Sequence, residues 1–137
     1  MSILIAKSDE NIDASNKLIK ASLFSSSVHC SYYGCAQLML HLLRSHFGKT
    51  ELEISKEGRM GAKDYKGFHQ WLQNVIFEEF ARLNNVDAAK FNSKIRSLCA
   101  ARVKADYKVE EIIDKEALKA YDMSVEAKKL LTKNFVL

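Results

Sequence analysis

The sequence predicts an all-α fold, a largely up-and-down bundle of about five helices. Apolar residues recur at helical spacing in five segments, and no segment alternates between apolar and polar residues for long enough to form a sheet. The chain contains no proline, so nothing forces a break inside the helical patterns. Its 137 residues suit one domain, which we expect to span residues 1–137.

The first expected helix runs from about Ser8 to about Phe24. Ser8 is a suitable N-cap, and Asp9 and Glu10 place negative charge in the first turn, where a helix favours it. The serine cluster at residues 25–27 then predicts a turn.

The second expected helix, about residues 28–47, is the most apolar segment of the chain. A helix that is apolar over most of its circumference belongs at the centre of a bundle. Gly34 in this helix allows a neighbouring backbone to approach closely. The apolar residues are Tyr32, Cys35, Ala36, Leu38, Met39, Leu40, Leu42, Leu43 and Phe47.

Residues 48–63 lack helical periodicity and hold three glycines, so we expect the one long flexible connection of the chain here. Its four basic residues are nearly balanced by three glutamates. The segment has no GxxxxGK[ST] pattern, which excludes a Walker-type phosphate loop.

Three further helices complete the predicted bundle. The third covers about residues 64–83 and packs through Phe68, Trp71, Leu72, Val75, Ile76 and Phe80. Asn84 and Asn85 make a tight connection to the fourth, about residues 86–108. Asp114 is the expected cap of the last helix, which extends to about Phe135.

Composition excludes several classes of protein. No run of about 18 apolar residues is present to span a bilayer. The N-terminal MSILIAKSDE reaches acidic residues too soon for a signal peptide, so we expect a cytoplasmic protein. Cys30, Cys35 and Cys99 lack the spacing of a metal site and are expected to be reduced thiols. We predict no metal and no cofactor.

Basic residues gather in one part of a chain whose formal net charge is only +4. Such a local excess attracts phosphate groups, although a solvated helix face produces the same pattern. Both interpretations stay open from the sequence. Between residues 82 and 104 the local balance is +5, from Arg82, Lys90, Lys94, Arg96, Arg102 and Lys104 against Asp87.

Arg102 falls on the apolar face of the fourth expected helix. At about 100° per residue it shares that face with Ile95 and Leu98. A buried guanidinium without a partner is costly, and Asp106, four residues on, is placed to form an ion pair with it. The helical spacing by itself favours this paired structural charge. The alternative is that Arg102 lines a cleft, where its fork of N–H groups binds phosphate.

Tyr107 adds a hydroxyl to the candidate site. Five residues along an ideal helix place it roughly 140° round from Arg102. We therefore expect the two side chains to converge only if the helix is distorted or if a second subunit brings another copy to the seam. The candidate RNA- or nucleotide-binding residues are Arg102, Asp106, Tyr107, Lys104 and Lys94.

Three segments, SYYGCAQLMLHLL, FHQWLQNVIFEEF and SLCAARVKADY, together resemble the HEPN domains of bacteria and archaea. Many HEPN domains have a YYA-like second helix and an R…ADY segment near the end of the fourth, in the same order. The resemblance covers about residues 8–135 and includes the last expected helix. It implies a bundle of four or five helices that often dimerises. It also implies RNA cleavage or nucleotide binding in toxin–antitoxin, defence or stress systems.

Active HEPN nucleases carry an Arg followed, after four to six residues, by a His, and these residues gather at a cleft commonly formed by two subunits. None of the five arginines here has a histidine at that spacing, and Tyr107 stands at the position that follows Arg102. The pKa of histidine, about 6.5, suits proton transfer in metal-free RNA cleavage, whereas tyrosine, at about 10, is a poor base. The absence of the motif histidine weakens the interpretation as a nuclease, whereas the interpretation of Arg102 as a phosphate-binding residue stands.

The four histidines are scattered along the sequence. His41 and His46 point about 140° apart on one expected helix and cannot easily share a metal. His69 adjoins Phe68 and Trp71, and we expect it to be a packing or surface residue.

The leading hypothesis is a HEPN-like module that binds RNA or a nucleotide, forms a homodimer and is not a usual HEPN ribonuclease. A second hypothesis is a protein-interaction subunit that docks a nucleotidyltransferase-type antitoxin. The third is a metal-independent ribonuclease that uses Tyr107 or a non-standard histidine. The sequence does not identify catalytic residues.

Overall fold

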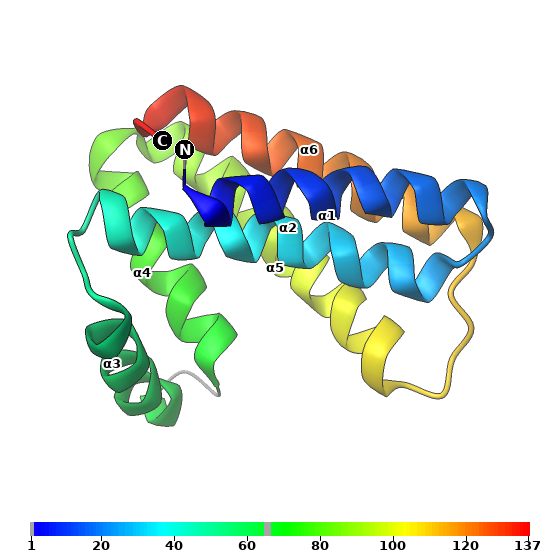
Figure 1. Cartoon of the computed structure of the whole chain (residues 1–137), viewed down its shortest axis with the longest axis horizontal. Helices are drawn as coiled ribbons and strands as arrows, with labels where there is room; N and C mark the ends of the chain where they lie inside the picture. Colours follow the sequence, from blue (N-terminus) through cyan, green and yellow to red (C-terminus); the bar gives the residue numbers. More distant parts are fainter. Residues whose placement is uncertain (1, 65–66) are drawn as a thin grey trace.

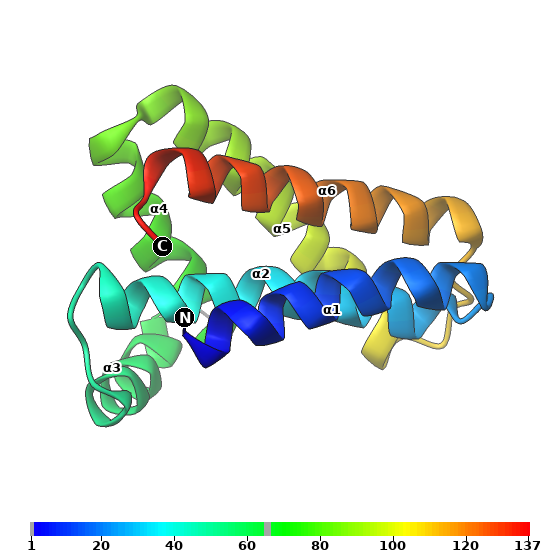
Figure 2. The same cartoon turned by 45° about the horizontal axis from the view of Figure 1, so that its top comes forward.

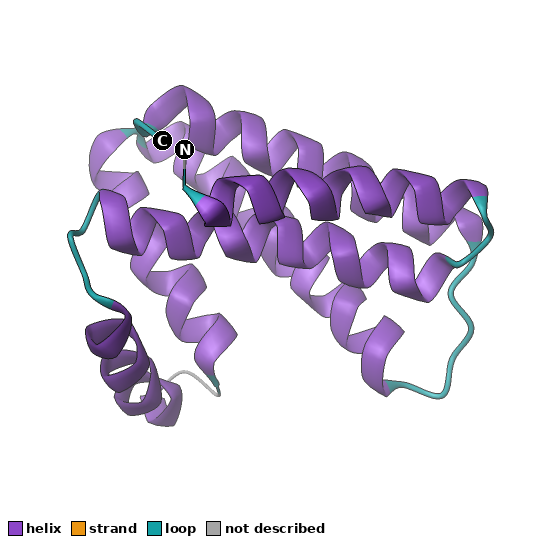
Figure 3. Ribbon diagram, viewed as in Figure 1, coloured by secondary structure: helices purple, strands orange, loops and turns teal. Residues whose placement is uncertain are grey.

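The computed structural model describes residues 2–64 and 67–137. This part of the chain is all-helical, without a strand (Figure 3), as the sequence predicted. It holds six helices rather than five, namely α1 (Ile3–Lys20), α2 (Phe24–Ser45), α3 (Glu51–Asp64), α4 (Phe68–Leu83), α5 (Asn85–Tyr107) and α6 (Asp114–Asn134).

Helix α2 is the centre of the bundle, as its apolar circumference indicated. It packs against α1, α4, α5 and α6. Helices α1, α2 and α6 run side by side along the long axis, with both termini at the same end (Figures 1 and 2). No helix of the described ranges has the length and hydropathy to cross a membrane. The largest fully buried side chains are Tyr32, Leu38, Met39, Leu42, Leu43, Leu72, Ile76, Ile95, Leu98, Phe80, Phe91 and Leu131.

Helix α1 begins earlier than its predicted N-cap, Ser8. The cap is Ser2, whose hydroxyl accepts a hydrogen bond from the backbone N–H of Leu4 at 3.1 Å. Ser8 lies inside the helix, fully buried, and donates to the carbonyl of Gly34 at 2.6 Å. A Cβ on Gly34 would lie 2.6 Å from Ile12 Cγ1, so glycine permits the close contact of α1 and α2 that its position predicted.

The serines at residues 25–27 belong to the first turn of α2 and not to the predicted turn. The chain reverses one step earlier, at Ser22, which has a φ of 60°. Ser27 is needed inside the fold, because it donates to the backbone carbonyl of Ser15 at 2.8 Å and its hydroxyl contacts the Ser15 hydroxyl. Together with buried Ser31, these hydroxyls satisfy one another between α1 and α2.

Helix α3 replaces much of the flexible connection that we predicted at 48–63. It starts with a capping box, in which Thr50 Oγ1 accepts from the Glu53 N–H at 3.1 Å and the Glu53 carboxylate accepts from the Thr50 N–H at 3.3 Å. Its glycines serve packing: a Cβ on Gly58 would lie 2.6 Å from the ring of Phe68, and one on Gly61 would lie 1.9 Å from Trp71. Small residues therefore bring α3 against α4.

The remaining boundaries agree with the prediction to within a few residues. The predicted start of the third helix near Asp64 falls beside residues 65–66, which lie outside the described ranges, and α4 begins at Phe68. Asn84 alone connects α4 to α5, and its side chain accepts from the N–H of Asp87 at 3.1 Å. Asp114 is the first residue of α6 and not its cap, which is Ile113.

Candidate functional site

Arg102 lies on the buried face of α5, in line with Phe91, Ile95 and Leu98, as the helical spacing predicted. Only 7% of its surface is exposed. A buried guanidinium must find compensating interactions, so its surroundings decide what it can do.

Three tyrosine rings surround the Arg102 guanidinium. Its Cζ lies 5.1 Å from the centroid of Tyr32 and 5.7 Å from the centroids of both Tyr33 and Tyr107. These are cation–π distances, each worth about 0.5–2 kcal/mol. Tyr32 and Tyr33 come from α2, whereas Tyr107 is the last residue of α5.

The convergence of Arg102 and Tyr107 within one chain corrects the expectation that it would need a distorted helix or a second subunit. The angle of 140° describes where the Cβ atoms point on the helix. Both side chains are long, and the ring of Tyr107 reaches to 5.7 Å from the Arg102 Cζ although the two Cβ atoms point apart.

Two polar partners of Arg102, Tyr33 and Asp106, lie at long distances. Its Nη1 donates to the Tyr33 hydroxyl at 3.5 Å and lies 3.8 Å from Asp106 Oδ2, while its Nε is buried without a hydrogen-bond partner. The predicted ion pair with Asp106 is therefore present but long. Burial lowers the pKa of Arg102, but Tyr33 and Cys99 outweigh this effect, and the net pKa lies above its ordinary value. The site thus holds a permanent cation with unused donor capacity.

His29 meets the same carboxylate oxygen as Arg102. Its Nδ1 lies 2.9 Å from Asp106 Oδ2, and its ring centroid is 4.6 Å from that of Tyr33. The His29 side chain is 48% exposed. A carboxylate on Nδ1 orients an imidazole and directs its Nε2 outward, which is the arrangement of an acid–base histidine.

His69 is a packing residue, as we expected, and its ring lies 5.2 Å from that of Tyr32, 5.7 Å from that of Tyr33 and 5.8 Å from that of Phe68. These contacts place it in the group of side chains around Arg102, which we call the Arg102 cluster. Gln73 Nε2 donates to the Tyr32 hydroxyl at 3.2 Å, and this hydroxyl lies 2.8 Å from His69 Nδ1. The Tyr32 hydroxyl can then donate its proton to Nδ1, and in that tautomer His69 carries its own proton on Nε2. Burial, and then the charge of Arg102, lower the pKa of His69. A neutral imidazole with an N–H donor results.

The two lysines of the predicted site lie on the other side of α5, against α6. Lys94 forms an ion pair with Glu126, and Lys104 lies 3.1 Å from Glu116 Oε2 and 3.7 Å from Glu110. The structure therefore brings together Arg102, Asp106 and Tyr107 but not the lysines. Burial raises the pKa of the Cys35 thiol to about 12 and raises that of Cys30, so neither is a ready nucleophile.

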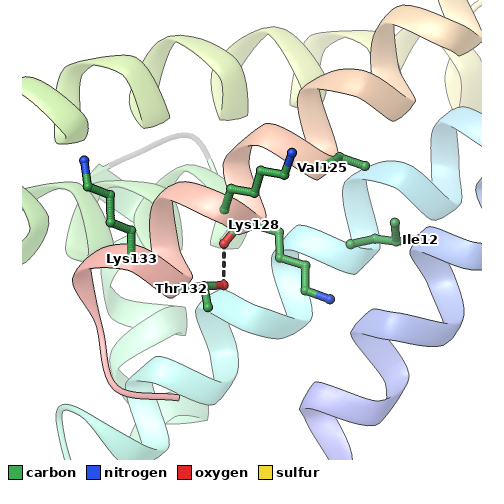
Figure 4. Close-up of a pocket in the computed structure, with 6 residues that line it drawn as sticks. Ile12, Val125, Lys128, Thr132 and Lys133 are labelled. Atoms are coloured by element: carbon green, nitrogen blue, oxygen red, sulfur yellow. Dashed lines mark hydrogen bonds between the residues drawn. The ribbon is translucent and has the colours of Figure 1, made fainter.

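No group of His, Cys, Asp or Glu side chains within residues 2–64 and 67–137 is arranged to hold a metal ion. A groove of about 500 Å³ between α1 and α6 is lined by Ile12, Val125, Lys128, Lys129, Thr132 and Lys133 (Figure 4). Lys128 pairs with Asp9 and Lys133 with Asp87, and the Thr132 hydroxyl donates to the Lys128 carbonyl. These ion pairs neutralise much of the positive charge of the groove. The Arg102 cluster is therefore the better candidate for a functional site.

Comparison with protein-family models, with curated proteins and with solved structures finds no match to this chain. The case for a function therefore rests on the residues themselves and on the resemblance to HEPN domains.

Lowering the pH from about 7.5 to 5.5 should lower the melting temperature. Burial lowers the pKa of His41 and of His69, so the folded state keeps both neutral, while the unfolded chain takes up protons near pH 6.5. Their contribution to stability is complete above about pH 6.5 and is lost as the pH falls below it. Thermal melts followed by circular dichroism would test this. A His41→Leu/His69→Gln variant should show a flatter pH dependence, and a wild-type melting temperature constant over this range would contradict the expectation.

Proposed function

We propose that this chain is a HEPN-like helical module that binds RNA or a nucleotide through the phosphate, at Arg102. The observation that carries the proposal is a buried cation whose Nε has no hydrogen-bond partner within the described residues and whose contacts with the Tyr33 hydroxyl and Asp106 Oδ2 are long, at 3.5 and 3.8 Å. A phosphate oxygen at hydrogen-bond distance is a stronger acceptor than either, and the guanidinium fork suits two of its oxygens.

Access to Arg102 requires a small movement at the end of α5. Asp106 and Tyr107 cover the guanidinium, and Tyr107 is 71% exposed. Since α5 ends at Tyr107 and the next helix begins at Asp114, side chains in this last turn rearrange at low cost. His69 is kept neutral because burial and the charge of Arg102 lower its pKa, and its N–H supplies a second hydrogen-bond donor for an anionic ligand.

Replacing Arg102 should weaken RNA binding by roughly tenfold or more, because charge-assisted hydrogen bonds contribute about 1.5–3 kcal/mol. Fluorescence anisotropy with a labelled single-stranded RNA would measure this for Arg102→Met, which keeps the side-chain volume, and for Arg102→Lys, which keeps the charge and loses the fork. Arg96→Ala is the matched control, because Arg96 is an exposed arginine of α5 whose Nε donates to Asn92 at 3.1 Å. Equal affinities for Arg102→Met and Arg96→Ala would reject the proposal, provided that circular dichroism shows both variants folded.

A second candidate function is metal-independent RNA cleavage, favoured by two histidines beside Arg102. In this scheme His29, oriented by Asp106, takes the proton of the ribose 2′-hydroxyl. The 2′-oxygen then displaces the 5′-oxygen from phosphorus, a water molecule protonates this leaving oxygen, and protonated His29 returns its proton to the hydroxide that remains. His69, which is neutral, hydrogen-bonds the phosphate and does not give up a proton. The products are a cyclic 2′,3′-phosphate and a 5′-hydroxyl. Cleavage that is lost in both His29→Ala and Arg102→Met would support this function, and cleavage that survives both would indicate contamination.

Exposed apolar residues beside the cluster favour a further candidate, docking of a protein. Val109 is fully exposed and Ile113 is 48% exposed, in the connection that follows Tyr107. Such residues suit a second copy of the chain or a nucleotidyltransferase-type partner. Sedimentation of the wild type and of Val109→Asp, alone and with the partner, would distinguish a homodimer from a complex with the partner. If the contact runs through this connection, the aspartate charge of Val109→Asp should weaken it.

A further inference from the structure

A groove of about 510 Å³ adjoins the Arg102 cluster. It lies between the first two turns of α2 and the last turn of α5, and is lined by Ser25, Ser26, His29, Cys30, Ala105, Asp106 and Tyr107. Its volume is in the range of small-molecule sites, about 300–1,000 Å³. Asp106 and Tyr107 both line the groove and contact Arg102, so the movement of these side chains that opens access to the guanidinium also joins it to the groove.

Two flat side chains are available to a ligand in this groove. Tyr107 comes from α5 and is 71% exposed, and His29 comes from α2 with its side chain 48% exposed. Exposed aromatic rings beside a cation are the usual platform for an unpaired base, and the larger face of a purine stacks on them better than that of a pyrimidine. The ring of Tyr107 already lies over Arg102, which links the stacking surface to the phosphate-binding charge.

The polar groups of the groove also discriminate between bases. The contacts of Asp106 with His29 and Arg102 both use Oδ2, and Oδ1 can serve as the acceptor for a ligand. An ionised carboxylate only accepts hydrogen bonds. It therefore suits the amino groups of adenine and guanine, and it disfavours uracil, whose single N–H stands between two carbonyls. The hydroxyls of exposed Ser25 and Ser26 add further donors to the lining.

We infer that this groove binds one purine nucleotide unit, with the base stacked on Tyr107, an amino group on Asp106 and the phosphate on Arg102. The inference rests on the proposed function and narrows its ligand to a nucleotide that is not base-paired. The same chemistry is offered by a free purine nucleotide and by an unpaired purine in single-stranded RNA.

Calorimetric titration of wild type and Tyr107→Ala with AMP, UMP and inorganic phosphate would test the groove. We expect wild type to bind AMP more tightly than UMP. Tyr107→Ala should weaken AMP binding about tenfold or more, in line with the loss of one stacked base, and should not weaken the binding of phosphate, because Tyr107 covers the guanidinium and is not itself a phosphate ligand. Tyr107→Phe should bind AMP as wild type does. Tyr121→Ala, which removes a tyrosine of α6 outside the groove, is the matched control.

The outcomes separate this inference from the proposed function. If Tyr107→Ala binds AMP as tightly as wild type while Arg102→Met does not, the groove is not the base site and the phosphate site stands. If Arg102→Met also binds both AMP and RNA as wild type does, both ideas fail. A third experiment compares the affinity for single-stranded oligo(A) with the affinity for the oligo(A)–oligo(U) duplex. Preference for the single strand supports an unpaired RNA base, AMP binding without oligo(A) binding identifies a free nucleotide, and equal binding of duplex and single strand overturns the inference.

Discussion

Phe80→Ala should lower the free energy of unfolding by about 3–5 kcal/mol, the usual cost of deleting a fully buried aromatic ring. Phe80 has no exposed surface, and its ring centroid lies 5.6 Å from that of Phe91 and 5.3 Å from that of Phe135. The side chain thus joins α4 to α5 and to the residue that follows α6. Removing the ring leaves a cavity bordered by α4, α5 and Phe135. The cavity cannot close fully, because the one-residue connection at Asn84 limits how far α4 and α5 can move.

Urea denaturation of wild type and Phe80→Ala would measure this loss, with the midpoint shifting at an unchanged slope. Phe77→Ala is the matched control, since Phe77 lies on the same helix and is only partly buried against the core. A loss for Phe80→Ala no larger than that for Phe77→Ala would contradict the role assigned to Phe80.

Gly61→Val should detach α3 from α4 and leave the rest of the bundle folded. Even a Cβ at residue 61 would lie 1.9 Å from Trp71 Cδ1 and 2.5 Å from its Nε1, too close for any side chain. Helix α3 packs mainly on α4, so it has little else to hold it in place. Overpacking of this kind costs about 1–3 kcal/mol or more, and the clash here is removed only by moving the helix or the ring.

Trp71 reports this change directly, because it is the one tryptophan of the chain and is 7% exposed. Its fluorescence emission should shift to longer wavelength in Gly61→Val, while the far-ultraviolet circular dichroism loses only a small part of its helical signal. Lys56→Val places the same β-branched side chain at an exposed position of α3 and should leave the emission unchanged. An unshifted emission in Gly61→Val would show that α3 accommodates the valine.

Local features were predictable from the sequence, because helical periodicity depends only on residues close in the chain. The buried position of Arg102, its pairing with Asp106 and the central place of α2 all follow from spacing. Helix α3 was missed because its glycines and scarce apolar residues conceal the period. The capping box of Thr50 and Glu53 was the signal that would have predicted its start.

The histidines of the candidate site were not predictable in the same way. His29 and His69 reach the cluster through Asp106 and Tyr32, which lie 77 and 37 residues away in the sequence. No rule of spacing relates such pairs, because the packing of α2 against α4 and α5 brings them together. The angle of 140° between Arg102 and Tyr107 led to a wrong expectation about their separation. It describes the directions of the Cβ atoms and not the length of the side chains.

The Arg102 cluster is divided along the chain by the connection between Ser45 and Glu51. Two of its stacking rings, Tyr32 and Tyr33, precede this connection, whereas the cation follows it. In two fragments separated there, Arg102, Asp106 and Tyr107 stay together on one fragment. The other fragment holds the opposite wall of the groove, formed by Ser25, Ser26, His29 and Cys30, and two of the three rings around the guanidinium, so neither fragment alone has the groove. If ligand binding returns when the two fragments are mixed, the fragments have associated in the native arrangement. Ligand binding would therefore measure whether α2 has packed against the rest of the chain.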